Sequence, residues 1–573
     1  MPATPADRAG AARASWLDLN FAAAHCNRGN WRLAAGESNG AVSDYRQTAS
    51  GNRHVSLVAL PFRGDNPRHR CYNLKGKVFG GSLQTSLQKR TKRGRTMLSR
   101  RDLVLSASAV ALAAPYIVSS SAIAATPIVR RDVMDMDAKD PFFSDYAKAV
   151  KKMHELPGDH RSWSAQARIH ADQCHHGDLE FLHWHRHYIR FFEKICAELC
   201  GNPDFALAYW NWSKNSGRIP APFFDRPELN VEHWNDPGQY VGKAWGAIDT
   251  VGRRGLDKSH GLMDDPARAG AFTLATINGI KKLPSIDLFR PALEGQPHNT
   301  AHIITGATRS GKGGHMGSGL SPLDPIFWLH HCMVDRVWAE WQNSGHDTPD
   351  PQADYSGMFF EADGKPATAN STGAMKIADL DYTYDIFQRP AAAAVSAQLN
   401  TEQVNSLKQI LQPGPAEAIG SAANGSSSRA NIETAIDIAA PGIPARVTQL
   451  EELEQATGAT GGRRILAILS NIAQPEKDDL LVNVFVDCPY LSPTTPSSDP
   501  HYAGTFSFFG VSKKMQGMDG MKPPTYVVDI TGPVRQAGLA KDKIRVQLMP
   551  LTASQGRESG STFQVGKVEI VSV

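Results

Sequence analysis

The sequence lacks the features of several common protein classes. Its 573 residues include only seven cysteines, an odd number at wide spacing with no Cys-x-x-Cys pair, which argues against a disulfide scaffold and a structural zinc ribbon. No apolar run reaches the roughly 18–20 residues that a bilayer-spanning helix needs, so no membrane span is predicted. Because 41% of the residues are hydrophobic and 21% are charged, the chain can bury a core, and wholesale disorder is excluded.

Acidic residues are scarce only in the first part of the chain. Residues 1–96 carry a net charge of +11, whereas the rest of the chain carries −7. The larger part is therefore mildly acidic, which argues against nucleic acid as its partner. Glycine, asparagine and arginine are scattered through residues 1–96 without a sustained period, which predicts an extension without regular structure.

Residues 97–125 resemble a twin-arginine export signal. The run Ser99-Arg100-Arg101-Asp102-Leu103 precedes an apolar stretch, and the small residues at 122–124 fit a cleavage site. Such a signal belongs at an N-terminus, so we expect translation to begin at Met97 and residues 1–96 to reflect a misplaced start. The signal implies the twin-arginine export machinery as a partner and a protein that is periplasmic or secreted after folding. The alternative is a buried helix with a chance arginine pair.

The remaining sequence predicts two domains. Residues 126–390 are rich in aromatic residues and histidine and carry helical periods, whereas residues 391–445 are typical of a connector and a Gly/Ser-rich linker. Residues 446–573 contain short apolar runs bounded by turn residues, which predict strands at Leu480–Val486, Tyr526–Ile530, Lys543–Leu548 and Lys567–Val573. The predicted fold class is a mainly α domain followed by a small β-sandwich.

Histidine is concentrated in two short segments. Eleven of the 20 histidines lie within residues 170–187 and 298–331. Neither a solvated face nor an apolar core requires imidazoles at this density, whereas neutral imidazole is the commonest metal ligand in proteins. Both segments are therefore candidate metal-binding sites.

Three imidazoles of the first segment can converge on one ion. His185 opens a run with helical apolar spacing, and His176 lies nine residues before it. At 100° per residue the two would lie on opposite sides of one helix, so His176 must lie on a loop, and Gly177-Asp178 supports a break there. His170 ends a preceding segment that is predicted to be helical. The three rings would thus come from a helix, a loop and a helix.

The second segment predicts a similar set. His298 and His302 are four residues apart, which places both on one face of a helix, with Cβ atoms about 6 Å apart. The third imidazole comes from a later helix, where His330 and His331 are adjacent. Because adjacent helical positions diverge by about 100°, we expect only one of the pair to face inward. Asp335 lies one turn beyond His331 and is close enough to orient it. The two segments together predict two metal ions.

These motifs resemble those of the tyrosinase family. The run from His185-Arg186 to Phe192-Glu193 resembles the family's first copper signature, and residues 324–338 resemble the second. Residues 297–302 are similar to the paired-ligand helix between them. The similarity covers about residues 128–388. From Leu480 onward, the sequence more weakly resembles the C-terminal sandwich of plant-type polyphenol oxidases.

The resemblance implies an antiparallel four-helix bundle that holds two copper ions, with O₂ as co-substrate. One ion would be bound by His170, His176 and His185, and the other by His298, His302 and His331. An all-imidazole set is neutral and suits both oxidation states of copper. The implied enzyme is a tyrosinase or catechol oxidase acting on small phenols. It would hydroxylate monophenols to o-diphenols and oxidise o-diphenols to o-quinones, as a monomer or an oligomer.

The family pattern implies further roles. Glu294 and Asn299 would hold a water that deprotonates a monophenol, so that the pair acts as a general base; alternatively, Glu294 pairs with the helix start at Pro297. Cys174 has the spacing of a cysteine that forms a thioether to the histidine at the position of His176. The alternative is a buried free thiol.

The C-terminal sandwich is expected to cover the copper site as a lid. Tyr490, Tyr502 or a nearby phenylalanine would enter the site, whereas a purely structural sandwich is the alternative. Three other functions remain open: a catechol or o-aminophenol oxidase without monophenolase activity, a haemocyanin-like O₂-binding protein, and a dinuclear zinc or iron hydrolase. The hydrolase is disfavoured because such sites usually include bridging carboxylates, which both histidine motifs lack.

Overall fold

The chain divides into two compact units, Met1–Ser121 and Ala122–Val573. In the first unit, the computed structural model describes an antiparallel strand pair, β1 (Gly76–Phe79) and β2 (Ser82–Thr85), in a segment expected to lack regular structure. The proposed export signal and start site lie outside the described residues. In the second unit the structure describes residues 127–234, 250–307, 313–388, 416–429, 433–457, 463–473, 475, 479–509, 524–536, 542–553 and 562–573.

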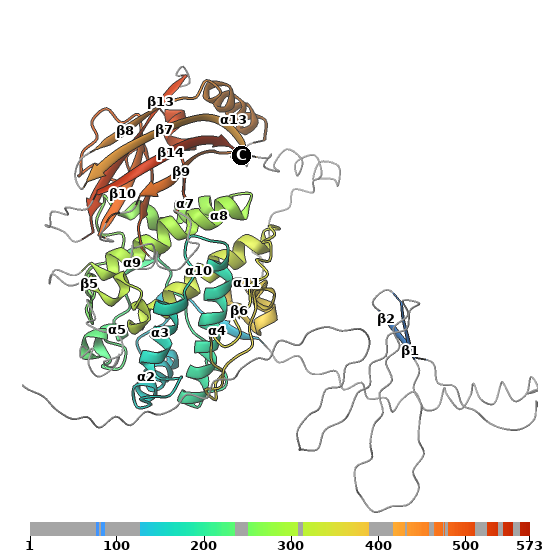
Figure 1. Cartoon of the computed structure of the whole chain (residues 1–573). Helices are drawn as coiled ribbons and strands as arrows, with labels where there is room; N and C mark the ends of the chain where they lie inside the picture. Colours follow the sequence, from blue (N-terminus) through green and yellow to red (C-terminus); the bar gives the residue numbers. More distant parts are fainter. Residues whose placement is uncertain are drawn as a thin grey trace, which may run out of the picture. The chain divides into compact units, whose positions relative to one another are not determined.

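Helices form the first part of the second unit (Figure 1). The longest are α2 (Pro141–His154), α3 (Trp163–Gln173), α4 (Glu180–Cys200) and α10 (Ile326–Asn343). Shorter ones are α5 (Pro222–Asp225), α7 (Leu274–Ile280), α8 (Ile286–Leu293), α9 (Asn299–Gly306) and α11 (Asp385–Gln388). Aromatic rings join the long helices: Phe192 of α4 stacks on Trp328 of α10 with ring centroids 3.4 Å apart. The helical core is therefore built around buried aromatic contacts.

Local sequence signals fix the ends of the helices that carry histidines. Helix α3 begins after Ser162, whose hydroxyl accepts a hydrogen bond from the Ala165 amide at 3.2 Å. It ends at Cys174, where the backbone becomes extended. Helix α4 ends at Gly201, whose φ of +73° lies in the left-handed region that glycine tolerates best. His170 consequently sits in the last turn of α3.

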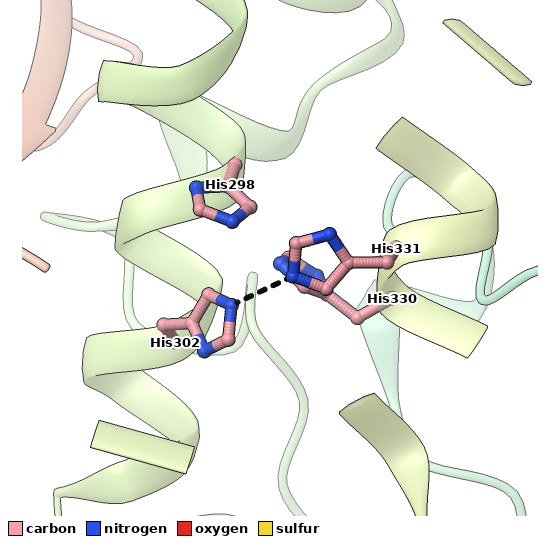
Figure 2. Close-up of side chains that lie close together, drawn as sticks. All are labelled: His298, His302, His330 and His331. Atoms are coloured by element: carbon pink, nitrogen blue, oxygen red, sulfur yellow. Dashed lines mark hydrogen bonds between the residues drawn. The ribbon is translucent and has the colours of Figure 1, made fainter. Parts of the chain in front are cut away.

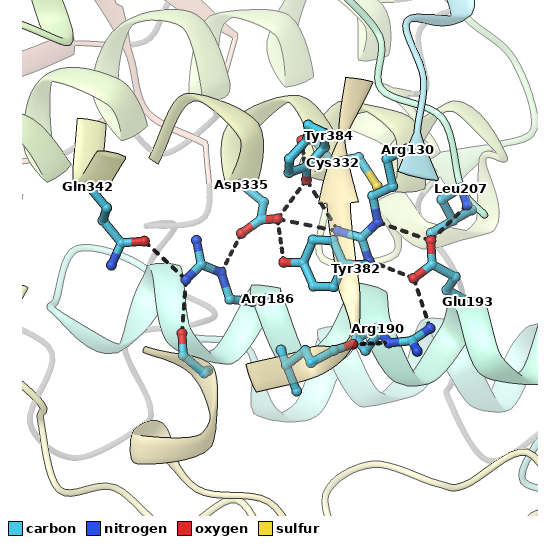
Figure 3. Close-up of polar contacts among 12 residues, drawn as sticks. Arg130, Arg186, Arg190, Glu193, Leu207, Cys332, Asp335, Gln342, Tyr382 and Tyr384 are labelled. Atoms are coloured by element: carbon cyan, nitrogen blue, oxygen red, sulfur yellow. Dashed lines mark hydrogen bonds and ion pairs between the residues drawn. The ribbon is translucent and has the colours of Figure 1, made fainter. Parts of the chain in front are cut away.

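A buried ionic cluster links the first and last segments of the helical domain to α4 and α10 (Figure 3). Asp335 accepts hydrogen bonds from Arg186 Nε at 2.5 Å and from the hydroxyls of Tyr382 and Tyr384 at 2.6 Å each. Arg130 Nη1 lies 3.3 Å from the same carboxylate. Arg130 and the tyrosines belong to a parallel strand pair, β3 (Ile128–Arg130) and β6 (Tyr382–Tyr384). A further two-residue parallel pair joins β4 (Thr250–Val251) and β5 (Gly313–Gly314).

The C-terminal region forms two antiparallel four-stranded sheets, which confirms the predicted fold class of a helical domain followed by a β-sandwich. One sheet has the order β11-β10-β13-β8 and the other β12-β9-β14-β7. The strands are β7 (Glu417–Arg429), β8 (Thr434–Ala439), β9 (Ile465–Ala473), β10 (Leu480–Val486), β11 (Tyr502–Ser507), β12 (Tyr526–Asp529), β13 (Lys543–Thr552) and β14 (Thr562–Ser572). Helices α13 (Ile443–Thr457) and α14 (Thr531–Gln536) complete the region.

The strand β10 is buried on both faces. Leu480, Val482 and Val484 belong to the apolar core of the sandwich. Leu481 instead joins the core of the helical domain, and the Asn483 amide donates to the carbonyl of Ala267 at 2.7 Å. The alternation follows from the two-residue period of a strand. Burial on both faces explains why the sequence of β10 is a nearly continuous apolar run. The contacts of Leu481 and Asn483 also show that the sandwich packs on the helical domain.

The structure corrects the predicted start of the sandwich at residue 446. The Gly/Ser-rich residues that composition assigned to a linker form β7 and β8. Strand β7 pairs with β14 from Glu417 opposite Ser572 to Arg429 opposite Thr562, at the edge of its sheet. An edge strand needs backbone pairing on one side only, and small polar side chains do not prevent it. The rest of the predicted connector, residues 391–415, lies outside the described residues.

None of the described helices is both long and apolar enough to cross a membrane.

Candidate dinuclear metal centre

The structure gathers the two histidine segments into two clusters. His170 comes from α3, His176 from the following loop and His185 from α4. The second cluster contains His298, His302, His330 and His331 (Figure 2). Within each cluster, one potential ligand atom from every residue lies within 4.8 Å of those of the others. All seven residues are buried.

In the first cluster, backbone carbonyls orient the imidazole rings. The Nδ1 atoms of His170 and His185 lie 2.8 Å from the carbonyl oxygens of Gly319 and Phe181. A carbonyl only accepts, so each Nδ1 must carry the proton and donate it. The Nε2 atoms of both rings are buried and have no hydrogen-bond partner among the described residues. This tautomer leaves a lone pair on Nε2, as expected of a metal-ligating histidine held by a second hydrogen bond.

His176 lies on a loop, as the helical period requires. The chain leaves α3 at Cys174 and turns at Gly177, whose φ is +79°. The Gly177 amide donates to a carboxylate oxygen of Glu294 at 2.7 Å, which ties the loop to the other histidine-bearing segment. The Sγ of Cys174 lies 3.4 Å from His176 Nδ1, and the Nε2 of His176 has no partner in the described part of the chain.

The second cluster begins in a π-helical turn, η7 (Glu294–His298), which continues into α9. His298 Nδ1 lies 2.8 Å from Asn299 Oδ1, and His302 Nδ1 lies 2.8 Å from the carbonyl of Met316. The Nε2 atoms of His302 and His331 are 3.4 Å apart. Two tetrahedral ligands at about 2.0–2.1 Å from one ion are about 3.3 Å apart, so this spacing fits a shared ion.

The two clusters face each other. The rings of His185 and His331 are stacked with centroids 4.3 Å apart and planes at 6°. On the other side, the rings of His176 and His298 have centroids 5.7 Å apart. Ions held by the two clusters would therefore be neighbours in one centre.

Burial keeps the imidazoles neutral. It lowers the pKa of His170 to about 4 and that of His298 to about 3. The pKa values of His176, His185 and His302 are also well below the usual value, because of burial first and of neighbouring imidazoles second. The same causes lower the pKa of His331. At neutral pH the rings therefore keep the lone pairs that a metal ion needs.

The common central domain of tyrosinase matches residues 147–344, a range that contains every histidine of both clusters. This part of the chain is therefore a tyrosinase domain.

Individual relatives agree with this assignment. A chloroplastic polyphenol oxidase of Spinacia oleracea is 29% identical over 278 residues, which are 40% of this chain and 42% of that protein. The chloroplastic catechol oxidase B of Solanum tuberosum is 32% identical over 238 residues, or 36% of this chain and 40% of the relative. The matched region thus spans about two fifths of the length of these relatives.

Solved structures show that the fold extends beyond the matched sequence. The structure of a latent aurone synthase, a polyphenol oxidase, matches 78% of this chain and 90% of its own, with a TM-score of 0.52 and 19% identity. The likeness therefore takes in the C-terminal β region as well as the tyrosinase domain.

His330 is a member of the second cluster that sequence reasoning excluded. Adjacent helical positions diverge by about 100°, and only one of His330 and His331 was expected to face inward. The structure places both within the cluster. The rings of His302 and His330 have centroids 4.5 Å apart, which is closer than the 5.6 Å between His302 and His331. Adjacent residues of a helix can both contribute to one cluster when the cluster lies between the directions in which their side chains point.

Asp335 does not take the orienting role predicted for it. Its carboxylate oxygens are bound to Arg130, Arg186 and two tyrosine hydroxyls, as in Figure 3. The buried Nδ1 of His331 has no hydrogen-bond partner among the described residues. The Asp335 carboxylate, one helical turn from His331, instead forms ion pairs with arginine side chains from β3 and α4. Asp335 is thus a structural ion-pair centre of the tyrosinase domain.

Glu294 and Asn299 are both buried next to the second cluster and bind different partners. Glu294 accepts from the Gly177 amide and pairs with Arg290. Burial raises the pKa of its carboxyl group, although Arg290 and the Gly177 amide oppose the rise. The Asn299 amide nitrogen donates to the carbonyl of Ser507 at 3.1 Å. The Asn299 backbone N–H donates to the Glu294 carbonyl, but no described contact joins the Glu294 carboxylate to the Asn299 side-chain amide.

A phenylalanine from the sandwich reaches the second cluster. The Phe509 ring lies parallel to the His302 ring, with centroids 3.7 Å apart and planes at 4°. The side chain is buried and also contacts His298 and His176, at centroid distances of 5.8 and 5.6 Å. Of the residues considered from the sequence, Tyr490 is instead exposed, and Tyr502 packs against Gly270 of the helical domain.

Proposed function

We propose that this chain is a dicopper oxidase that uses O₂ to oxidise o-diphenols to o-quinones and to hydroxylate monophenols to o-diphenols. The observation that carries the proposal is the pair of facing clusters of buried, neutral imidazoles, most of them with Nε2 unpaired. The family relatives include polyphenol oxidases and a catechol oxidase, which supports the same reaction class.

The donor set fits copper. His170, His176 and His185 would hold one ion, and His298, His302 and His331 the other. Imidazole is suited to both oxidation states of copper, and the described clusters contain no carboxylate of the kind that bridges dinuclear hydrolase sites. When bound, a copper pair supplies the two-electron exchange between O₂ and a phenol. In the diphenol reaction, two o-diphenols give up four electrons and four protons, and one O₂ becomes two waters. In the monophenol reaction, one oxygen atom of O₂ enters the ring, and the o-diphenol so formed gives up two electrons and two protons that convert the other atom to water, which leaves an o-quinone.

The chain's own residues would orient the ligands and move the phenol proton. Backbone carbonyls hold the Nδ1 protons of His170, His185 and His302, so these rings cannot turn freely. We assign to Glu294 and Asn299 the positioning of a water that takes the proton of a monophenol. The hydrogen bond to the Ser507 carbonyl occupies one of the two N–H donors of the Asn299 amide. While the sandwich is in place, this contact would hinder the positioning of the water and so favour diphenol oxidation over monophenol hydroxylation.

We further propose that the sandwich keeps the enzyme latent. The end of β11 and the segment just beyond it supply both contacts. The Ser507 carbonyl accepts a hydrogen bond from the Asn299 amide, and the ring of Phe509, two residues later, covers His302. A phenolic ring that approaches the second cluster would need the space that Phe509 occupies. A sandwich that is purely structural would leave turnover unchanged when this ring is removed.

A thioether between Cys174 and His176 is also proposed. The Sγ lies 3.4 Å from the ring, and burial raises the pKa of the thiol, so it is present as SH rather than thiolate. Formation of the S–C bond removes one hydrogen from sulfur and one from ring carbon, and O₂ would accept the two electrons and two protons. The bond would fix the ring of His176 on its loop.

Export through the twin-arginine pathway to the periplasm or beyond remains a proposal that rests on residues 97–125. Replacing Arg100 and Arg101 by lysine should retain the chain in the cytoplasm, as cell fractionation would show. A tryptic peptide from residues 1–90 in cells would instead show that translation starts before Met97.

One assay tests the proposed reaction. Purified chain loaded with copper is supplied with catechol, a 4-alkylphenol and an o-aminophenol, and O₂ uptake is followed. Uptake with catechol supports the oxidase, and uptake with the monophenol supports the full tyrosinase reaction. Reversible O₂ binding without turnover of any substrate would indicate an oxygen carrier and overturn the proposal.

A further inference from the structure

The sandwich meets the helical domain along one edge of each of its two sheets. Strand β12 is an edge strand of one sheet, and strand β11 is an edge strand of the other. The side-chain amide of Gln296 donates to the Val527 carbonyl of β12 at 2.9 Å. Three residues later, the Asn299 amide donates to the Ser507 carbonyl of β11 at 3.1 Å. Because edge strands carry backbone groups that their own sheet leaves unpaired, one short stretch of the helical domain covers both edges.

Two glycines make this contact close. A Cβ atom added to Gly295 would lie 2.5 Å from Cδ1 of Tyr526, so the Tyr526 ring of β12 packs directly on the backbone at Gly295. A Cβ atom added to Gly504 of β11 would lie 2.7 Å from Oε1 of Gln296. The side chain of Gln296 is buried, and the two edge strands hold it in place.

Gln296 belongs to the π turn η7, which also carries Glu294. Pro297 has no backbone N–H, so the α-helical hydrogen-bond ladder is interrupted there. The Asn299 backbone N–H instead reaches back five residues to the Glu294 carbonyl. The Glu294 carboxylate accepts the Gly177 amide from the loop of the first cluster. A contact that fixes Gln296 therefore fixes a turn that belongs to the metal centre.

We propose that Gln296 is a positioning residue through which docking of the sandwich orders the turn η7, and that this contact is released when the site opens. The inference rests on the latent state proposed above and names a contact outside the histidine clusters that maintains it. Phe509 covers the site from the sandwich, whereas Gln296 reaches from the helical domain to the sandwich. Because the two contacts are separate, loss of either one weakens the docked state.

Water can replace the contact between Gln296 and Val527. Both residues contribute to the wall of a cleft of about 660 Å³ that lies between α7 and the sandwich. Lys282 and Arg463 of the same cleft are exposed, so the cleft opens to solvent. A hydrogen bond that is exchanged for bonds to water contributes only modestly to stability. The contact can therefore hold the sandwich and still be released.

Hydrogen exchange of the copper-free, full-length chain tests this coupling without requiring turnover. Gln296→Leu keeps much of the side chain's bulk but cannot donate to the Val527 carbonyl. Gln166→Leu is the matched control, because Gln166 is also buried and donates to a backbone carbonyl, that of His160, at 2.8 Å within the helical domain. Amide exchange of residues 294–299 is followed by mass spectrometry. The kinetics of catechol oxidation per copper are measured in the same variants.

Gln296→Leu should speed amide exchange in residues 294–299 and raise kcat/KM for catechol about 2-fold to 10-fold, the range expected from loss of one hydrogen bond. The gain should appear as a lower KM with an unchanged kcat, because substrate binds only to the open fraction of molecules. A purely structural role would not lower KM. Gln166→Leu should change neither measurement.

Unchanged exchange of residues 294–299 or an unchanged KM in Gln296→Leu would overturn the proposal, as would equally faster exchange in Gln166→Leu. If Gln296→Leu does not fold, Gly504→Ala decides the question from the sandwich side, because the added methyl group displaces the Gln296 amide. Unchanged exchange in that variant would also overturn the proposal. Absence of catechol oxidation by the copper-loaded parent chain would instead contradict the proposed function, on which the exchange measurement does not depend.

Discussion

The Phe509 ring stacks on the His302 imidazole, with centroids 3.7 Å apart and planes at 4°. An aromatic pair of this kind is worth about 0.5–1.5 kcal/mol beyond its buried area. Replacing Phe509 by Ala should therefore raise the diphenol turnover of the full-length enzyme by about 2-fold to 10-fold, because less free energy is needed to uncover the site. Initial rates of catechol oxidation, normalised to copper content, measure the change.

Tyr490→Ala is the control for the lid, since Tyr490 is an exposed aromatic residue of the same region. It should leave turnover unchanged. Equal rates for the parent chain and Phe509→Ala, at equal copper content, would mean that the sandwich does not hold the site closed through this ring.

Asn299 is expected to matter more for monophenols than for diphenols. In a Phe509→Ala background, Asn299→Ala should lower monophenol hydroxylation by about 100-fold or more, the range of a positioned general base, with a much smaller loss of diphenol oxidation. Asn299 Oδ1 also accepts a hydrogen bond from His298 Nδ1, so copper content has to be measured in parallel. A similar loss on both substrates at full copper loading would show that Asn299 acts only by orienting His298.

Asp335 should be a large contributor to folding stability. Burial alone would raise its pKa, but Arg186, Arg130 and two tyrosine hydroxyls hold it below the usual value. Removing one member of a buried ion pair costs about 3–5 kcal/mol, so Asp335→Asn should strongly lower the unfolding free energy of the copper-free protein at pH 7. Chemical denaturation measures the loss.

The sign of the pH dependence follows from the lowered pKa. The contribution of Asp335 is complete above its unfolded pKa of about 3.9 and is lost as pH falls through the lower folded value. The difference in unfolding free energy between the parent chain and Asp335→Asn should therefore be constant near neutral pH and become smaller in acid. Asp437→Asn, which removes an exposed pair with Arg545, should change little. A gap that widens in acid would contradict this account of Asp335.

The thioether can be read from peptide masses. If the bond forms, the peptides carrying Cys174 and His176 should be about 2 Da lighter than their sequence predicts and should resist thiol alkylation. Cys174→Ser should restore the expected mass. Cys196, a buried free thiol of α4, provides the alkylation control after denaturation. An alkylatable Cys174 in the copper-loaded enzyme would rule out the bond.

Much of the centre could be predicted because helical geometry is local. The nine-residue spacing of His176 and His185 excludes a shared helix face and places His176 on a loop, where the structure has it. The four-residue spacing of His298 and His302 puts both rings on one side of the chain. The apolar run of β10 predicted a strand with the bounds that the structure shows.

The parts that could not be predicted depend on tertiary contacts. Nothing local distinguishes Phe509 from its neighbour Phe508, yet Phe508 packs in the sandwich core and Phe509 packs on His302. The role of Asp335 depends on arginines 149 and 205 residues away in sequence. The 100° divergence of adjacent helical positions predicted that only one of His330 and His331 would face inward, whereas the second cluster contains both.

The Gly/Ser-rich segment forms a strand because of its backbone pairing, which its composition does not reveal. Strand β7 satisfies its hydrogen bonds by pairing with β14, a partner more than 130 residues later that a local reading cannot see. A protease site placed in residues 417–439 would therefore damage the sandwich rather than release it.

The central claim is that two imidazole clusters bind two coppers in one centre, and copper stoichiometry tests it most directly. The fully loaded chain should hold two coppers per chain, His185→Ala and His302→Ala should each hold about one, and a double variant should hold none. Fewer than two coppers in the loaded parent chain, or full loading of either single variant, would contradict the account.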